Sequence, residues 1–275
     1  MRSTFRYTFS RSWVARFSIV FFILLSCWWL TIHARGLTGG SENNAFTLLY
    51  PLFSLWGGIS GIFIAEKWGG FRSILGRSLL VLSLGLLSQF LGQAAYAYYI
   101  YIQGIEIPYP SLGDIGYFGS IVFYIYGVYL LGRAIGVKIS LRSYLGQAQA
   151  ILIPIVMLAI SYIVFLRDYS FDWSSPLKIL LDFGYPFGQA IYVSLAILAF
   201  TLSIKLLGGI MRSPILFLIL ALVVQYISDY TFLYQVSTEQ WYIGGVNDYM
   251  YLISYFLMTL GLIQLGTALS RIRET

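Results

Sequence analysis

Charged side chains are scarce in this sequence. Asp, Glu, Lys and Arg make up 10% of its 275 residues, whereas a soluble domain usually carries about a quarter. Hydrophobic residues make up 59% of the chain, and the mean hydropathy is +0.78. A soluble core of this size cannot bury so much apolar surface, so we expect a protein that is embedded in a lipid bilayer.

Cysteine and histidine are almost absent. The single cysteine, Cys27, excludes a disulfide framework and a cysteine metal cluster, and the single histidine, His33, excludes bis-histidine haem ligation and a zinc site. The sequence also lacks a glycine-rich nucleotide motif, a metalloprotease HExxH motif and a nucleophile elbow. We therefore expect no enzyme, no catalytic residues, no cofactor and no bound metal. The net charge of +6 is interpreted as membrane topology, so no nucleic-acid partner is expected.

Long apolar runs dominate what is present. They are about twenty residues long and do not alternate, which predicts transmembrane helices and not the strands of an outer-membrane barrel. Gly and Pro clusters separate the runs. The predicted spans are 14–33, 46–66, 78–101, 115–136, 147–166, 178–206, 214–235 and 248–269.

Basic residues fall mainly on one side of these spans. Three lie on the other side, at Arg35, Arg167 and Lys178. This bias predicts that both termini are cytoplasmic and that the protein lies in the cytoplasmic (inner) membrane. The basic residues of the predicted cytoplasmic side are Arg2, Arg6, Arg11, Arg16, Lys67, Arg72, Arg77, Arg133, Lys138, Arg142, Lys205, Arg212, Arg271 and Arg273.

An internal repeat relates the two halves of the sequence. Tyr50-Pro51 recurs as Tyr185-Pro186, 135 positions later, and similar offsets relate the third span to the seventh and the fourth to the eighth. Four spans per unit give both units the same orientation. The sequence thus predicts an all-α integral membrane protein, one membrane domain of two tandem parallel four-helix repeats at 1–140 and 141–275. The best-matched positions are Asp114, Tyr117, Ser120, Gly127, Leu131, Gly132 and Ala134. In the alignment of the two halves they correspond to Asp248, Tyr251, Ser254, Gly261, Leu265, Gly266 and Ala268.

Asp229 is the most informative polar residue inside a span. It lies on the order of 22 Å along a hydrocarbon core of about 30 Å, and Gln225 precedes it by one turn on the same helix face. The repeat places Gln89 and Gln93 at the matching positions of the third span. An intramembrane acid suggests a ligand or proton site, and the alternative is a hydrogen bond that only holds helices together.

Two further acids, Asp114 and Asp248, begin the fourth and eighth spans. Ser111 and Asp114 have the spacing of a capping box, and Asn247-Asp248 is expected to cap the last helix directly. The competing interpretation is an outer ligand vestibule. Its lining would comprise Asp114, Asp248, Tyr117, Tyr251, Tyr50 and Tyr185.

The repeated prolines, Pro51 and Pro186, fall inside predicted helices. Proline removes a backbone hydrogen bond, so we expect structural kinks at both positions. Kinks of this kind serve either helix packing or motion.

Several short segments resemble those of a known kind of membrane region. Residues 110–117, PSLGDIGY, look like a PSLADxxY segment, and 185–188, YPFG, look like YPLGD. Both segments, with the stretch from Asp229 to Tyr251, are similar to the multi-span sensory regions found N-terminal to bacterial GGDEF (diguanylate cyclase) and histidine kinase domains. Gln189 departs from that pattern, which has an acid there. The chain ends soon after its last span, so we expect no output domain.

The resemblance implies a non-enzymatic sensory or small-ligand-binding module that signals through a cytoplasmic or membrane partner protein. One alternative is a proton- or ion-coupled small-molecule transporter that uses the interface between the repeats. Another is a membrane scaffold subunit. The lipid bilayer is a partner in each case, and a homo-oligomer is compatible with all three.

Overall fold

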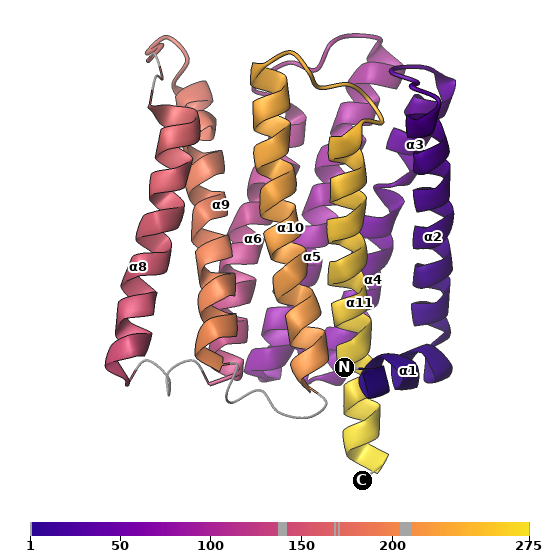
Figure 1. Ribbon diagram of the computed structural model, residues 1–275, viewed down its shortest axis with the longest axis vertical. Helices are drawn as coiled ribbons and strands as arrows, with labels where there is room; N and C mark the ends of the chain where they lie inside the picture. Colours follow the sequence, from indigo (N-terminus) through magenta and orange to yellow (C-terminus); the bar gives the residue numbers. More distant parts are fainter. Residues whose placement is uncertain (1, 137–141, 168, 170, 204–210, 275) are drawn as a thin grey trace. The chain divides into compact units, whose positions relative to one another are not determined.

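The computed structural model describes residues 2–136, 142–167, 169, 171–203 and 211–274. In these ranges the chain forms helices and no strand (Figure 1). Eight of the described helical segments are long and apolar enough to cross a membrane, which confirms the predicted number of spans. Their bounds are Trp13–Ala34, Ser41–Lys67, Ile74–Gln103, Leu112–Ala134, Tyr144–Leu166, Pro176–Leu202, Arg212–Val236 and Val246–Ile272.

The predicted span ends agree with these bounds to within a few residues. The second span is the exception, because its helical segment begins at Ser41, five residues before the predicted start at position 46. Residues 204–206 of the predicted sixth span lie outside the described residues, as do Lys138 and Lys205 of the predicted cytoplasmic side.

The chain divides into two compact units. The first comprises Met1–Trp68 and Gly208–Thr275, and the second comprises Gly69–Leu207. Each unit therefore takes spans from both halves of the sequence, and the units do not coincide with the predicted repeats 1–140 and 141–275. The repeat itself stays a prediction.

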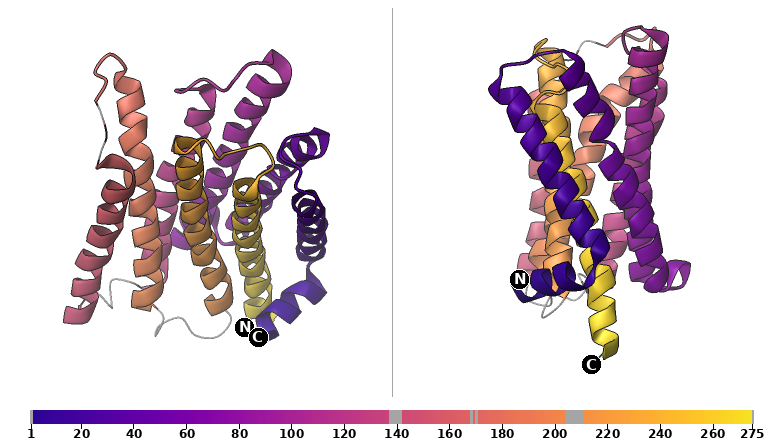
Figure 2. Two further views of the ribbon diagram at one scale, coloured as in Figure 1. Left: turned by 45° about the horizontal axis from the view of Figure 1, so that its top comes forward. Right: turned by 90° about the vertical axis from the view of Figure 1, so that its right-hand side faces the viewer.

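The first unit is built around the last helix, which contacts helices from both ends of the chain. Figures 1 and 2 show its two chain ends near each other at the same end of this unit. Its helices are α1 (Arg2–Arg11), α2 (Trp13–Ala34), α3 (Ser41–Leu49), α4 (Leu52–Lys67), α10 (Arg212–Ser237) and α11 (Val246–Glu274).

The second unit consists of two helix hairpins joined by contacts between α6 and α9. Its helices are η1 (Gly70–Arg72), α5 (Ile74–Ala97), η2 (Tyr98–Gln103), α6 (Leu112–Ala134), α8 (Tyr144–Ser161), η3 (Tyr162–Leu166) and α9 (Pro176–Ser203).

Serine side chains define where several helices begin. Ser12, Ser73 and Ser143 each accept a hydrogen bond from a backbone N–H in the first turn of α2, α5 and α8. Ser111 does the same for α6, and Asp114 Oδ2 accepts from the Ser111 N–H at 2.6 Å. The predicted capping box is therefore confirmed.

Small residues let α5 and α6 approach each other closely. A Cβ added to Gly116 would lie 2.4 Å from the Gly92 backbone nitrogen, so no larger residue fits there without moving the helix. Ser88 Oγ donates to the Gly116 carbonyl oxygen at 2.8 Å across the same contact. Lipid does not push apolar helices together, so such close packing and hydrogen bonds hold the pair.

The two repeated prolines have different surroundings. Pro51 lies between α3, which ends at Leu49, and α4, which begins at Leu52, so the helix is interrupted there. Pro186 lies inside α9, which continues past it, and the Pro186 carbonyl oxygen accepts from Ser161 Oγ of α8 at 3.2 Å. A hydroxyl of a neighbouring helix thus donates a hydrogen bond to the backbone at the proline.

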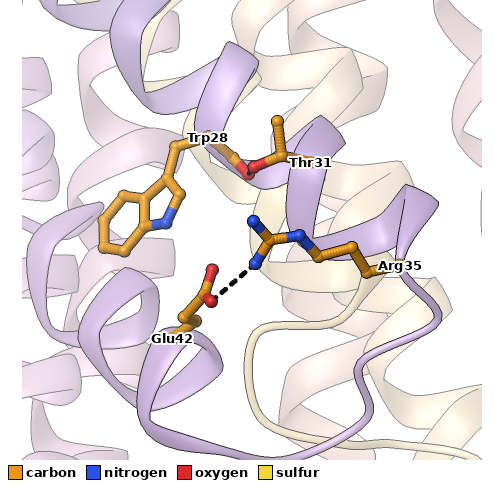
Figure 3. Close-up of polar contacts among 4 residues, drawn as sticks. All are labelled: Trp28, Thr31, Arg35 and Glu42. Carbon is orange, nitrogen blue, oxygen red and sulfur yellow. Dashed lines mark hydrogen bonds and ion pairs between the residues drawn. The ribbon is translucent and has the colours of Figure 1, made fainter.

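The α2–α3 loop carries an ion pair. Arg35 Nη1 lies 2.7 Å from Glu42 Oε1, and Figure 3 shows the two side chains meeting across the loop. Both side chains are largely exposed, at 60% and 40%, so the pair adds little stability.

Candidate functional site

Asp248 lies at the start of α11 and connects three segments of the first unit. Its Oδ2 accepts from Thr47 Oγ1 at 2.9 Å and from the Gly244 N–H at 2.8 Å, and its Oδ1 accepts from Tyr50 OH at 3.3 Å. α11 begins at Val246, so Asp248 lies in the first turn, where the helix dipole favours a negative charge. Its carboxylate joins α11 to α3 and to the break before α4.

Asn247 does not cap α11, contrary to the prediction. It lies inside the first turn, and its Nδ2 donates to the Ser228 carbonyl oxygen of α10 at 2.7 Å. Tertiary contact with α10 has replaced the local cap. Asp248 accepts from the Gly244 N–H, which precedes α11, and so attaches the preceding loop to the first turn of the helix.

Asp229 and Gln225 form a buried network with α11. Asp229 Oδ1 accepts from Gln225 Nε2 at 3.0 Å and from Tyr251 OH at 2.9 Å, and Ser254 Oγ donates to Gln225 Oε1 at 3.0 Å. Asp229 is 8% exposed, Gln225 1% and Ser254 2%. These bonds join α10 to α11, as the interpretation of hydrogen bonds that hold helices together requires.

The corresponding network in the second unit joins α5 to α6. Gln89 Nε2 donates to Ser120 Oγ at 2.7 Å, and both residues are buried. Gln93 is half-buried one turn further along α5, and the Tyr117 ring packs against Gly92 between them. Gln89 and Gln93 thus belong to a different unit from Asp229 and Gln225.

Asp114 links α6 to α9 in the second unit. Tyr185 OH donates to Asp114 Oδ1 at 2.6 Å, while Oδ2 is held by Ser111 of the same helix start. The Tyr96 ring packs against Gly113 beside it and lies 5.0 Å from the Tyr117 ring. The predicted vestibule residues Asp114, Tyr117 and Tyr185 therefore belong to the second unit, and Asp248, Tyr251 and Tyr50 belong to the first.

Positions that the predicted repeat pairs with each other make similar contacts in the two units. Tyr185 binds Asp114 in one unit, and Tyr50 binds Asp248 in the other. The paired glycines behave alike too, since a Cβ on Gly127 would meet Leu82 and one on Gly261 would meet Leu218.

A fourth acid, Asp182, was missed by the sequence interpretation. It lies in the second turn of α9, is half-buried, and its carboxylate accepts two phenolic hydrogen bonds. Tyr109 OH donates to Oδ1 at 2.6 Å and Tyr169 OH to Oδ2 at 2.7 Å. An acid within the predicted span 178–206 was a signal that could have found it. We call Asp182, Tyr109 and Tyr169 the Asp182 cluster.

The Asp182 cluster joins two loops that are distant in sequence. Tyr109 comes from the α5–α6 connection and Tyr169 from the loop between η3 and α9. No ion pair between Asp182 and a Lys, Arg or His is found in the described part of the chain. Lys178, one turn before Asp182 on α9, is exposed and instead acts electrostatically on Asp172.

Both phenols of the cluster stay protonated at neutral pH. The hydrogen bond to Asp182 is the main cause that raises the pKa of Tyr169 to about 12. Burial, followed by the hydrogen bond to Asp182, raises the pKa of Tyr109 well above its usual value. The phenols therefore solvate the carboxylate as hydrogen-bond donors and supply no positive charge.

Aromatic rings surround the Asp182 cluster. The Tyr169 ring centroid lies 5.1 Å from that of Phe183 and 5.2 Å from that of Phe171. Phe171 also stacks on Phe183 and on Trp173, with centroids 5.5 Å apart in each case. Phe171 and Trp173 are 52% and 77% exposed. A carboxylate beside accessible aromatic faces is the chemistry that binds an organic cation.

No group of three or more His, Cys, Asp or Glu side chains able to hold a metal ion occurs among the described residues. Asp114, Asp182, Asp229 and Asp248 are instead distributed along the chain, and they accept hydrogen bonds from hydroxyl, amide or backbone donors. This arrangement suits binding and helix packing.

The two Tyr-to-Asp bonds between helices should contribute to stability. Tyr50→Phe and Tyr185→Phe each remove one hydrogen bond to a carboxylate and should lower the free energy of unfolding by about 1–2 kcal/mol. Tyr126→Phe, at a side chain that is 48% exposed, is the control and should change it little. Denaturant titration in mixed micelles measures all three. If the free energy of unfolding were equal in all three variants, the two hydrogen bonds would add no stability.

The Asp182 cluster should be visible in an alkaline titration. Because its pKa is raised, Tyr169 stabilises the fold fully below pH 10, the ordinary pKa of tyrosine, and this contribution is lost as the pH rises through 12. In Asp182→Asn, one tyrosine more than in the wild type should ionise between pH 10 and pH 12, as followed by phenolate absorbance. Adding Tyr169→Phe should abolish the difference. Asp172→Asn should leave the titration nearly unchanged, and a wild-type curve for Asp182→Asn would contradict the geometry.

Comparison with known proteins supplies no identity for this arrangement. No protein-family model matches the chain, and neither a curated protein nor a solved structure does. The function therefore has to be inferred from the chemistry of the chain's own residues.

Proposed function

We propose that this protein is a non-enzymatic membrane sensory module that binds a small organic cation, an amine or quaternary ammonium compound, at the Asp182 cluster. The observation that carries the proposal is a carboxylate that, within the described residues, accepts its hydrogen bonds from two phenols and has accessible aromatic rings packed around one of them.

Charge supports a cationic ligand. Asp114 and Asp248 lie in the first turns of their helices, where backbone N–H groups and the helix dipole already stabilise a carboxylate. Asp182 lies in the second turn of α9, and within the described residues two phenols donate hydrogen bonds to it. A cation would therefore add to Asp182 an interaction that the helix ends already provide for the other two acids.

Shape supports an organic cation over a metal ion. Phe171 and Phe183 pack against the Tyr169 ring that binds the carboxylate, Trp173 stacks on Phe171, and aromatic faces attract alkylammonium groups. A divalent metal ion would require several oxygen ligands, and carboxylates are not clustered here in the described residues.

A signalling route follows from the contacts of α9. Asp182 holds two loops through Tyr109 and Tyr169, and one turn later Tyr185 holds Asp114 of α6. A ligand that competes with either phenol for Asp182 would release a loop. The release would change how α9 packs against α6. Such a change can reach a partner protein at the opposite end of these helices.

We propose the membrane location, the topology and the repeat together with this function. The bias of basic residues supports an inner-membrane location with cytoplasmic termini, and the short segments that resemble sensory regions support signalling through a partner. The matching Tyr–Asp and Gly–Leu contacts support two parallel repeats, each contributing helices to both units. A homo-oligomer is compatible with this arrangement.

Choline is a suitable probe for the ligand. The protein in nanodiscs should bind choline. It should bind more weakly the uncharged isostere of choline, in which a tert-butyl group replaces the trimethylammonium group. Asp182→Asn should weaken choline binding by about tenfold, because the charge attraction is lost. Asp172→Asn, a neighbouring exposed acid, should keep wild-type affinity. Isothermal titration calorimetry measures each affinity.

Three results would contradict this assignment. They are equal affinity for choline and its isostere, equal loss in the two Asp variants, and no binding of choline or of simple alkylamines. The helical circular dichroism and thermal midpoint of Asp182→Asn show that it folds before its binding is compared.

A second candidate is a proton-coupled carrier, and Asp229 favours it. This carboxylate is 8% exposed within a span and bridges Gln225 to Tyr251. In proteoliposomes with a pH gradient, a carrier would move amine substrates, and Asp229→Asn would abolish the flux. The sensory proposal predicts no flux in either protein, with choline binding retained in Asp229→Asn.

A further inference from the structure

The first helix places arginines beside the end of the last helix. α1 contains three arginines and no acid, and it contacts both α2 and α11. Thr8 Oγ1 lies 2.8 Å from Thr267 Oγ1, and Thr8 is buried, so this bond attaches α1 to α11 (Figures 1 and 2).

Two guanidinium groups converge on one ring at this contact. The Arg271 guanidinium carbon lies 5.4 Å from the Tyr7 ring centroid, and that of Arg11 lies 6.0 Å from the same centroid. The ring attracts both cations, yet it carries no net charge that would neutralise them. Arg11 forms no ion pair in the described part of the chain. An anion at this contact would be attracted by both groups.

Exposed aromatic residues continue from the arginines onto α2. Phe9, Trp13 and Phe17 are 45%, 63% and 47% exposed. The Trp56 ring of α4 lies 6.0 Å from Trp13 and 5.1 Å from Phe17, so the aromatic group is anchored to the unit. Trp beside exposed Arg is typical of the membrane interface, where rings lie at the level of the lipid headgroups.

Ser12 marks the boundary between the basic helix α1 and the aromatic start of α2. It separates α1 from α2, and its Oγ accepts from the Ala15 N–H at 3.2 Å. The polar helix α1 thus ends where the apolar helix α2 begins. A molecule with an anionic head and apolar tails matches the basic surface of α1 followed by the apolar surface of α2.

We propose that the contact between α1 and the end of α11 is a binding site for an anionic glycerophospholipid of the surrounding membrane. Arg11 and Arg271 bind the phosphate, and the acyl chains lie along Trp13 and Phe17. The two helix ends that meet here also carry Arg2 and Arg6 on α1 and Arg273 and Glu274 on α11, so their formal charge is net positive.

Lipid composition should test this site. In nanodiscs of phosphatidylcholine, adding phosphatidylglycerol should raise the thermal midpoint of the wild type. Arg11→Gln with Arg271→Gln should lose most of that rise and bind phosphatidylglycerol on the order of tenfold more weakly, as native mass spectrometry of retained lipid would show. Because the rise is compared within each variant, a change of intrinsic stability does not affect the result.

A second pair of exposed arginines provides the matched control. Arg133 lies over Tyr129 at 5.9 Å, and Arg142 is exposed on the same predicted side of the membrane. Arg133→Gln with Arg142→Gln removes the same charge and should keep the full rise. Equal loss in both double variants would indicate general charge attraction and overturn the site. An equal rise from inorganic phosphate in phosphatidylcholine nanodiscs would overturn the lipid as its occupant.

Discussion

A carboxylate that leaves water must find hydrogen-bond donors or a counter-charge, and this constraint shapes the polar contacts of the chain. Lys and Arg are concentrated at helix ends and loops, as in the Arg35–Glu42 pair, and the hydrogen-bond donors to Asp114, Asp229 and Asp248 are other groups. Tyrosine serves instead: Tyr50, Tyr185 and Tyr251 each donate to an Asp from another helix. A phenol brings one donor on a large apolar ring, which suits lipid-embedded helices.

The Asp residues of the chain divide by what else supports them. Asp114 and Asp248 also accept backbone hydrogen bonds at helix starts, so their tyrosines mainly hold helices together. Asp182 has two phenols from two loops and exposed rings beside it. The same Tyr–Asp chemistry thus gives a structural bond at Asp114, Asp229 and Asp248 and a more accessible one at Asp182. Under the proposed function, accessibility and not the residue pair distinguishes the ligand site from the packing bonds.

Sequence reasoning succeeded where the cause was local. The capping box at Ser111 and Asp114 depends on residues three apart, and Gln225 reaches Asp229 because they are four apart on one helix. It failed where distant elements compete, as when Asn247 turned to the Ser228 carbonyl oxygen of α10. It also passed over Asp182, whose partners Tyr109 and Tyr169 lie in connections that no helical period describes.

Hydropathy and charge by themselves determined the eight apolar helices, because the need to bury backbone polar groups in lipid acts on each span separately. Only the tertiary structure decided how those helices group. Spans from both halves combine in each unit, through contacts such as Tyr185 to Asp114 across 71 positions. Long-range pairing depends on which faces meet, and a single helix does not encode that choice. For the same reason, the accessible carboxylate of Asp182 emerged only when its two loops were seen together.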